Sequence, residues 1–420
     1  MGATTPTPKV SRRDLGLLVI IGSLAFVAWP GATLWMILLA GSIALSVGVP
    51  LVVADRPALA ERLVPIAVIV LALLGAWGAY ERASGDGPLR DRAHDGGVIV
   101  TRAAAEDVAG LRNPYTRDFT DELPSSWLLV EGSDGEKVAN PVAQHFPYLP
   151  AAAIIHVPFV VASNAVGVTW DPRMLGWLAM VAAMVAVARR PEPAWLRLGA
   201  IAGVGGPFAI VYLGWGTNDL LAVALAVLAL CWGERRPALA GVALALALST
   251  KLLLAVLVPP LVLAVVLAGG WSAVRRWWTM PATLVVTCLP FFVASPSAFV
   301  NDTVMFNLGR TEPLFPTSGI GLPAAHPEVF SGAVLATVTL IGFVLAVAFP
   351  IWAVRRWPSV WTAGAAAGVA LLCVLVPART FQVNYLVLVA ALLPLAWLAS
   401  AASPAPALEV GAQRAADPAT

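Results

Sequence analysis

Charged residues are scarce in this chain. Only 12% of its 420 residues are Asp, Glu, Lys or Arg, whereas soluble domains carry about a quarter. Hydrophobic residues make up 59%, and the mean hydropathy is +0.82. This balance excludes an ordinary soluble protein and predicts an all-α polytopic protein embedded in a lipid bilayer.

Other absences narrow the function classes. The net charge is +2 and no Lys/Arg-rich run stands outside short helix connections, so no nucleic-acid partner is expected. The three cysteines lie in apolar segments without metal-ligand spacing, which excludes a disulfide framework or a zinc site. No second acid stands beside Asp95 in a DxD-type arrangement. We therefore predict no cofactor and no metal site; a divalent cation bound through oxygen at Asp95 is the alternative.

Apolar runs long enough to approach a bilayer span recur from residue 15 to residue 399. A spanning helix needs roughly 20 mostly apolar residues. No small-residue cleavage site follows the first run, so we expect a retained helix there. We predict twelve spans, at about 15–29, 32–53, 62–80, 173–189, 196–212, 217–233, 237–250, 252–268, 279–295, 333–353, 360–377 and 382–399.

Arginine positions predict the orientation. Pairs or clusters occur at residues 12–13, 56–62, 189–190, 235–236, 275–276 and 355–356, and the positive-inside rule places each on the cytoplasmic face of the plasma membrane. Both termini are then cytoplasmic: residues 1–14 precede three spans within 15–80, and 400–420 form a disordered tail. Residues 81–172 form a large extracytoplasmic loop, and the spans of 173–399 include a second outer loop at 296–332.

One apolar segment complicates this count. Residues 149–166 are apolar enough to span, but a crossing there would put Arg189 and Arg190 outside. We expect an interfacial or re-entrant helix, which suits its His156 and two prolines. A true span with a change of parity elsewhere is the alternative.

The first outer loop has the composition of a folded segment. Residues 81–148 hold twelve of the 24 acidic residues and also Trp, Tyr and Phe, so the loop should pack against the bundle. Apolar residues at helical spacing predict a short amphipathic helix from Val98 to Leu111, stopped by Pro114.

The first candidate site is His94-Asp95-Gly96-Gly97. Glycines allow close approach of the backbone to a ligand, and Asp95 could serve as general base toward a hydroxyl. The simpler interpretation is a turn aspartate that caps the following helix.

Two further groups in this loop suggest a binding site. Tyr115 with Asp118 and Asp121 combines an aromatic ring with carboxylates, as sugar sites do, although a solvated acidic loop has the same composition. His145 and Tyr148 precede the interfacial segment at headgroup level, where an aromatic belt is the alternative.

Basic residues on the outer side are unusual and need an explanation. Lys251 lies between two apolar segments, where it either snorkels or binds an anion such as phosphate. Arg310 and Arg379 add positive charge on the same side, which an anionic lipid headgroup would match. Asp171 and Asp219 begin spans and could be helix caps, and Asp171 could form a weak surface ion pair with Arg173.

The order of several short motifs resembles the GT-C superfamily of membrane glycosyltransferases, particularly the mycobacterial mannosyltransferase-like family that uses polyprenyl-phosphate sugars. The motifs cover residues 62 to 399. They are HDGGVIVTRAAAEDVAGLRNPY at 94–115, HFPYLP at 145–150, TWDPR at 169–173, LALSTK at 246–251, DTVMFNLGRTEP at 302–313 and FQVNYLVL at 381–388.

This resemblance implies a GT-C-like bundle that transfers a sugar, mannose or arabinose, from a polyprenyl-phosphate donor to a glycolipid or glycan acceptor with inversion. Asp95 matches the position of the base. Lys251 and Arg379 would hold the donor phosphate, and His145 or Tyr148 would line the headgroup pocket. His94, Tyr115, Asp118 and Arg310 complete the predicted substrate-binding set.

Two other functions fit the sequence. A lipid or solute transporter would show internal repeats, paired broken helices and ionisable residues in mid-membrane; we find no repeat, and the ionisable residues cluster near the span ends. A non-catalytic relative of the glycosyltransferases would keep the acidic loop without turnover.

Overall fold

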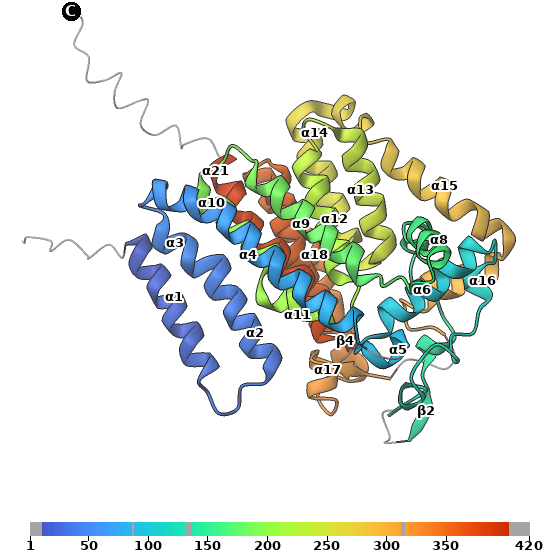
Figure 1. The fold of residues 1–420 in the computed structure, drawn as a ribbon. Coiled ribbons are helices and arrows are strands. Elements are labelled where there is room, and N and C mark those ends of the chain that lie inside the picture. Colours follow the sequence, from blue (N-terminus) through green and yellow to red (C-terminus); the bar gives the residue numbers. More distant parts are fainter. Residues whose placement is uncertain (1–10, 86–87, 132–135, 312–315, 403–420) are drawn as a thin grey trace, which may run out of the picture.

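The computed structural model describes residues 11–85, 88–131, 136–311 and 316–402. Almost all of its regular structure is helical (Figure 1). Two small strand pairs are exceptions: β1 (Leu129–Glu131) runs antiparallel to β2 (Lys137–Ala139), and β3 (Ser318–Gly319) runs parallel to β4 (Thr380–Phe381). The predicted tail lies almost entirely outside the described residues.

Every predicted apolar segment is helical, in places with a short π or 3-10 turn. The segments correspond to α1 (Arg12–Val27), α2–α3 (Leu34–Val53), α4 (Pro57–Ala83), α9 (Arg173–Ala188), α10 (Ala194–Gly205) with α11 (Pro207–Trp215), α12 (Asp219–Trp232), α13 (Pro237–Thr250), η5 (Leu252–Leu257) with α14 (Val258–Arg275), α15 (Thr279–Ala294), α18 (Gly332–Arg356), α19 (Val360–Leu375), and η7 (Val383–Tyr385) with α20 (Leu386–Leu392), η8 (Leu393–Leu395) and α21 (Ala396–Ala402).

Six helical segments of the described chain are long and apolar enough to cross a membrane. They are Leu34–Val53, Pro57–Ala83, Ala194–Trp215, Leu252–Arg275, Gly332–Arg356 and Val383–Ala401. Others, such as α9, α12 and α13, are apolar but shorter. The chain is therefore an α-helical membrane protein, and the count of twelve spans stays a prediction.

Short helices between the long ones gather at one end of the bundle, at the lower right of Figure 1. We call this the loop end. It holds α5 (Leu89–Arg92), α6 (Gly96–Ala109), η2 (Pro114–Thr116), η3 (Ser125–Trp127), η4 (Pro141–Ala143), α7 (Ala151–Ile154), α8 (Val157–Ala165), α16 (Pro296–Val300), η6 (Asn301–Met305) and α17 (Leu322–Ala325).

Two predictions for the loop end can be compared with these bounds. The amphipathic helix exists as α6, but it ends at Ala109, because Gly110 is its C-cap and Leu111 has φ +58°. Residues 149–166 form two helices broken at His156. The longer one, α8, has 9 residues, about 14 Å at 1.5 Å per residue, whereas the hydrocarbon core is about 30 Å thick.

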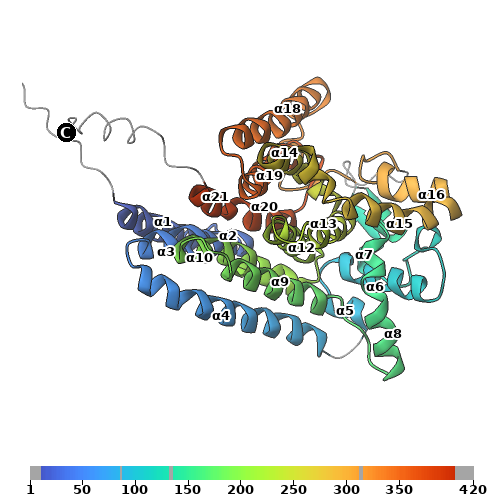
Figure 2. The same cartoon turned by 90° about the horizontal axis from the view of Figure 1, so that it is seen from above.

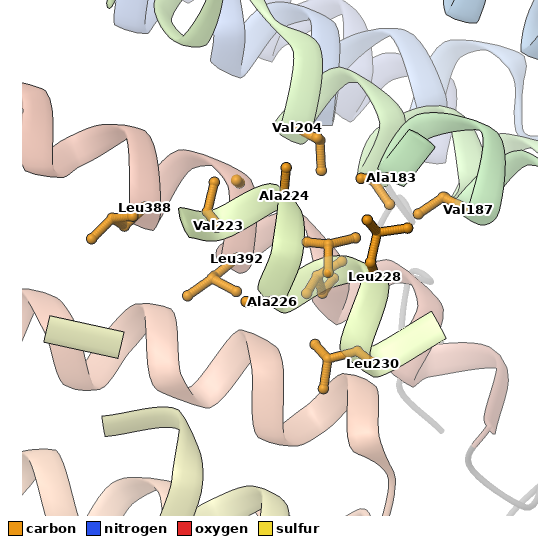
Figure 3. Packing of buried hydrophobic residues seen from close by; sticks show 14 of the residues in the cluster. Ala183, Val187, Val204, Val223, Ala224, Ala226, Leu228, Leu230, Leu388 and Leu392 are labelled. Carbon is orange, nitrogen blue, oxygen red and sulfur yellow. The ribbon is translucent and has the colours of Figure 1, made fainter. Parts of the chain in front are cut away.

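The core is built around α12. Its residues Val223, Ala224, Ala226 and Leu230 are at most 1% exposed. Figure 3 shows side chains of α9, α10 and α20 meeting α12 from different sides. This burial shows that α12 is enclosed by other helices and does not face lipid, so α12 and the residue that begins it are fixed by packing.

The ion pair of Asp171 and Arg173 is buried, which corrects our expectation of a weak surface pair. The Arg173 side chain is inaccessible to solvent, and its guanidinium contacts Asp171 at 2.9 Å. Arg173 Nη1 also donates to the carbonyls of Gly214 (2.9 Å) and Arg92 (3.3 Å). One side chain thus ties the loop end to the end of α11.

We expect Arg173→Ala to destabilise the protein strongly. It would leave the Asp171 carboxylate buried without its partner, a change that typically costs about 3–5 kcal/mol. Arg197→Ala is the matched control, because the Glu61 partner of Arg197 is 59% exposed and such pairs contribute about 1 kcal/mol at most. Thermal unfolding in detergent measures both; equal losses would contradict the anchoring role of Arg173.

Candidate functional site

Asp95 caps the N-terminus of α6, as the simpler interpretation predicts, and its role as a base stays a prediction. Its backbone is extended, and its Oδ1 accepts a hydrogen bond from the Gly97 N–H at 2.6 Å. The flanking backbone is bound to α11 and its C-cap: His94 N–H donates to Trp215 O (2.9 Å) and Val98 N–H to Gly216 O (3.1 Å). The Asp95 carboxylate is therefore held at a fixed place.

Three polar side chains converge on Gly97. A Cβ atom at this position would lie 2.8 Å from Asp95 Oδ1, 3.3 Å from Asn218 Nδ2 and 3.4 Å from Tyr148 Oη. Asn218 Nδ2 also donates to Gly97 O (3.2 Å) and to Thr101 Oγ1 (2.8 Å). The Asp95 carboxylate and the Tyr148 hydroxyl thus lie on the same side of the first turn of α6.

A buried ion pair lies beside this group. Lys251 Nζ is 3.1 Å from Asp219 Oδ1, and Asn384 Nδ2 donates to Asp219 Oδ2 at 2.7 Å. The Lys251 ammonium also lies 4.5 Å from the ring centroid of Tyr385, a cation–π contact. The residues come from the start of α12, the break between α13 and η5, and η7.

The electrostatics of the site centre on Asp95. Burial raises the pKa of Asp95, and the negative charge of Asp219 raises it further, while the Lys251 ammonium and the Gly97 N–H oppose the rise. Burial also raises the pKa of the Tyr148 hydroxyl. Burial alone would lower the pKa of Lys251, but Asp219 and the neighbouring groups raise it, so this lysine stays charged. The site thus combines the Asp95 carboxyl group with its raised pKa, the neutral hydroxyl of Tyr148 and the charged ammonium of Lys251.

Tyr115 holds the backbone of Tyr148 in place. Tyr115 is buried among Phe146, Phe291 and Phe299, and its hydroxyl donates to Tyr148 O at 2.8 Å. This placement makes Tyr115 a packing residue with a single polar contact.

Residues 145–148, which we call the strap, are also held by Asp302 of η6. Asp302 Oδ1 lies 2.7 Å from His145 Nδ1, and Oδ2 accepts from the Phe146 N–H at 2.8 Å. Both His145 and Asp302 are buried. Burial raises the pKa of Asp302, and the hydrogen bond to His145 opposes part of this rise. Asn307 Nδ2 adds a bond to Pro147 O at 3.3 Å. The strap therefore presents Tyr148 to Asp95 from a fixed support.

The other predicted site residues lie elsewhere. His94 is exposed, with its ring beside Trp215. Asp118 is an exposed turn residue that accepts from the Thr120 N–H. Arg310 and Arg379 are exposed, and the Arg379 guanidinium contacts Thr317 at 3.5 Å. Among the described residues, no hydrogen bond or ion pair joins Asp118, Arg310 or Arg379 to Asp95, Tyr148 or Lys251.

Sequence reasoning missed several residues of the site. Asp219 was expected as a helix cap or a direct site residue; the N-cap of α12 is instead Asn218. Asn218, Asn384, Tyr385 and Asp302 were not singled out. A signal did exist for Asn384, which stands with Gln382 at the start of an apolar run. An unpaired amide in such a segment is costly unless it meets a polar partner, which here is Asp219.

Within the described ranges, no group of three or more His, Cys, Asp or Glu side chains is placed to hold a metal ion. Comparison of the chain with protein-family models, curated proteins and solved structures found no match. The function is therefore argued from the site itself.

We expect Gly97→Ala to disrupt the site. Its Cβ would clash with Asp95 Oδ1 at 2.8 Å and crowd Tyr148, and overpacking of this kind typically costs about 1–3 kcal/mol. Gly96→Ala is the matched control, because its Cβ would meet only Leu123 and Val142 at 3.7 Å. Thermal unfolding of the two variants gives the comparison; an equal shift would contradict the convergence on Gly97.

Proposed function

We propose that this protein is an inverting glycosyltransferase that moves a sugar, mannose or arabinose, from a polyprenyl-phosphate donor to a glycolipid or glycan of the cell envelope. The observation that carries the proposal is the position of Asp95. This carboxylate has a raised pKa and lies at the end of an apolar bundle, beside a tyrosine hydroxyl and under the influence of a buried lysine. Such groups are typical of general bases.

The proposed reaction needs few protein groups. Asp95 takes the proton of an acceptor hydroxyl as its oxygen attacks the anomeric carbon. The bond from that carbon to the phosphate oxygen breaks, and the phosphate leaves with the electron pair. A phosphate leaving group needs positive charge rather than an acid. Lys251 can supply it, because an ammonium has three N–H donors and Asp219 takes only one.

The predicted orientation fits this chemistry. With the loop end on the extracytoplasmic side of the plasma membrane, Asp95 and Lys251 would lie at the outer leaflet, where a lipid-linked sugar donor would present its headgroup. Lys251 immediately follows an apolar helix, α13, so a lipid phosphate could reach it without leaving the membrane surface.

The test is sugar transfer by purified protein in detergent from a panel of radiolabelled polyprenyl-phosphate sugars. We expect Asp95→Asn to reduce transfer about 10²–10⁴-fold, the usual contribution of a general base, while donor binding persists. Asp91→Asn, an exposed residue of the same loop, should be unaffected. Equal activity of Asp95→Asn and wild type would remove Asp95 as the base; no transfer from any donor would favour a non-catalytic relative.

The pH dependence of transfer gives a second test. The base must be ionised, so the rate should fall as pH falls through the pKa of Asp95, which burial raises above the ordinary aspartate value of about 3.9. Hydrogen bonds from Thr120 instead lower the pKa of Asp118. An acidic limb above the ordinary value supports Asp95, and one below it would point to Asp118.

One observation favours a second function, transport coupled to protons. The Asp219–Lys251 pair is buried where helices are interrupted, at the start of α12 and the end of α13, and charged groups at broken helices are frequent in transporters. Uptake by vesicles containing the protein, driven by a pH gradient and abolished in Asp219→Asn, would support transport in place of transfer.

A further inference from the structure

An apolar groove runs along the bundle and ends at Arg82 and Trp215. It has a volume of about 610 Å³ and lies between α4, the residues Leu45 and Val49 of α2–α3, and α10–α11. Figure 2 shows α4 along the outer edge of the bundle, with α9 and α10 behind it. Its α4 lining is unusually accessible: Ile66, Leu74 and Trp77 are 52%, 51% and 66% exposed. A groove of this kind at the surface of a membrane protein faces acyl chains.

Positive charge lies at the loop end of this groove. Arg82 and the exposed Glu81 are its charged lining residues. Within the described chain, the Arg82 guanidinium forms no ion pair. Arg92 binds the Arg82 and Ala83 carbonyls through its guanidinium, which adds a second cation and fixes the turn after α4. Of the described residues that line this end or bind its backbone, Arg82 and Arg92 are cationic and Glu81 is anionic, so an anionic group there would meet net positive charge.

The groove is continuous with the segment that carries Asp95. Gly214 and Trp215 line it, and Trp215 O accepts a hydrogen bond from the His94 N–H at 2.9 Å. The rings of His94 and Trp215 lie 5.7 Å apart. Partial desolvation of the otherwise exposed His94 ring lowers its pKa, and the positive charges of Arg82 and Arg173 lower it further. Arg82, His94 and Asp95 thus follow one another from the groove toward the site.

We infer that this groove binds the acceptor, and that the acceptor is an anionic membrane lipid whose headgroup carries hydroxyl groups. Its chains lie along α4 and α10–α11, its negative charge lies at Arg82, and a headgroup hydroxyl reaches the Asp95 carboxylate past His94. This inference rests on the proposed function. It separates the two substrates: the donor phosphate is held at Lys251, and the acceptor enters from the side of α4.

In this arrangement the bonds form and break at the headgroup beside Asp95, while the groove residues contact only the acyl chains and the negative charge of the acceptor. The acceptor oxygen gives its proton to Asp95 and forms the new bond to the anomeric carbon, while the donor phosphate departs with the electrons of the broken bond. None of these steps involves the groove residues. Changes in the groove should therefore alter the apparent affinity for a lipid acceptor and leave donor binding and the rate at saturation unchanged.

Lipid binding can be measured directly by photo-cross-linking. The probe is phosphatidylglycerol with a photoreactive acyl chain, in phosphatidylcholine vesicles containing the full-length protein. We expect cross-links in peptides of α4, α10 and α11, competed by unlabelled phosphatidylglycerol and not by phosphatidylcholine. Val70→Trp, which fills the groove, and Arg82→Gln should each reduce them at least about fivefold.

Two controls match these variants. Val286→Trp places the same ring on an exposed position of α15, outside the groove (Val286 is 71% exposed), and Arg62→Gln removes an exposed arginine near the opposite end of α4. Both should cross-link as wild type. Cross-links elsewhere, or equal competition by phosphatidylcholine, would overturn the inference, and sugar transfer would then still stand on Asp95.

Transfer provides the second arm. With a phosphatidylglycerol acceptor, Val70→Trp and Arg82→Gln should raise KM about tenfold or more at unchanged kcat. Transfer only to soluble glycans would overturn the acceptor role while the proposed function survives. Cross-links in the groove with no transfer from any donor would instead refute the proposed function and with it the acceptor role, leaving a lipid-binding groove.

Discussion

The ion pair of Asp219 and Lys251 is the constraint on which the arrangement of the site depends. Asp219 is fully buried at the start of α12 and Lys251 is nearly so at the end of α13. Removing either charge from a buried pair leaves the other uncompensated, at a typical cost of about 3–5 kcal/mol. The beginning of one helix, the end of the next and the Asn384 turn must therefore meet at one point.

The Asp219–Lys251 ion pair also determines the positions of other residues at the loop end. Asn218, one residue before Asp219, binds the first two turns of α6 through Gly97 and Thr101. The first of these turns carries Asp95, so the packing of α12 in the core also sets the position of a carboxylate in a polar loop. Arg173 fastens the same loop to the end of α11. The proposed base is thus positioned by the most buried part of the molecule.

The sequence predicted the helices better than their contacts. Hydropathy identified the apolar segments, because burial in lipid requires long runs of apolar residues. It also predicted the helix α6, although Gly110 and not Pro114 ends that helix. Asp95, Tyr148 and Lys251 were each named as candidate site residues, but their mutual proximity was not predicted, and their roles stay predictions. Pairings such as His145 with Asp302 join residues 157 positions apart, and hydropathy carries no information on distance between segments. The exposure of Asp171 was also predicted wrongly. A carboxylate near the end of a span is expected at the surface, but here it forms a buried ion pair with Arg173.

The strap has a consequence for how ligands come and go. Each of its four residues is held by a hydrogen bond. Asp302 binds His145 and Phe146, Asn307 binds the Pro147 carbonyl, and Tyr115 binds the Tyr148 carbonyl. A segment held in this way is a rigid wall and not a lid. Exchange of ligands would then take place sideways, within the plane of the bilayer. Turnover of such a protein would follow the fluidity of the surrounding lipid, slowing in a gel phase and recovering when the chains melt.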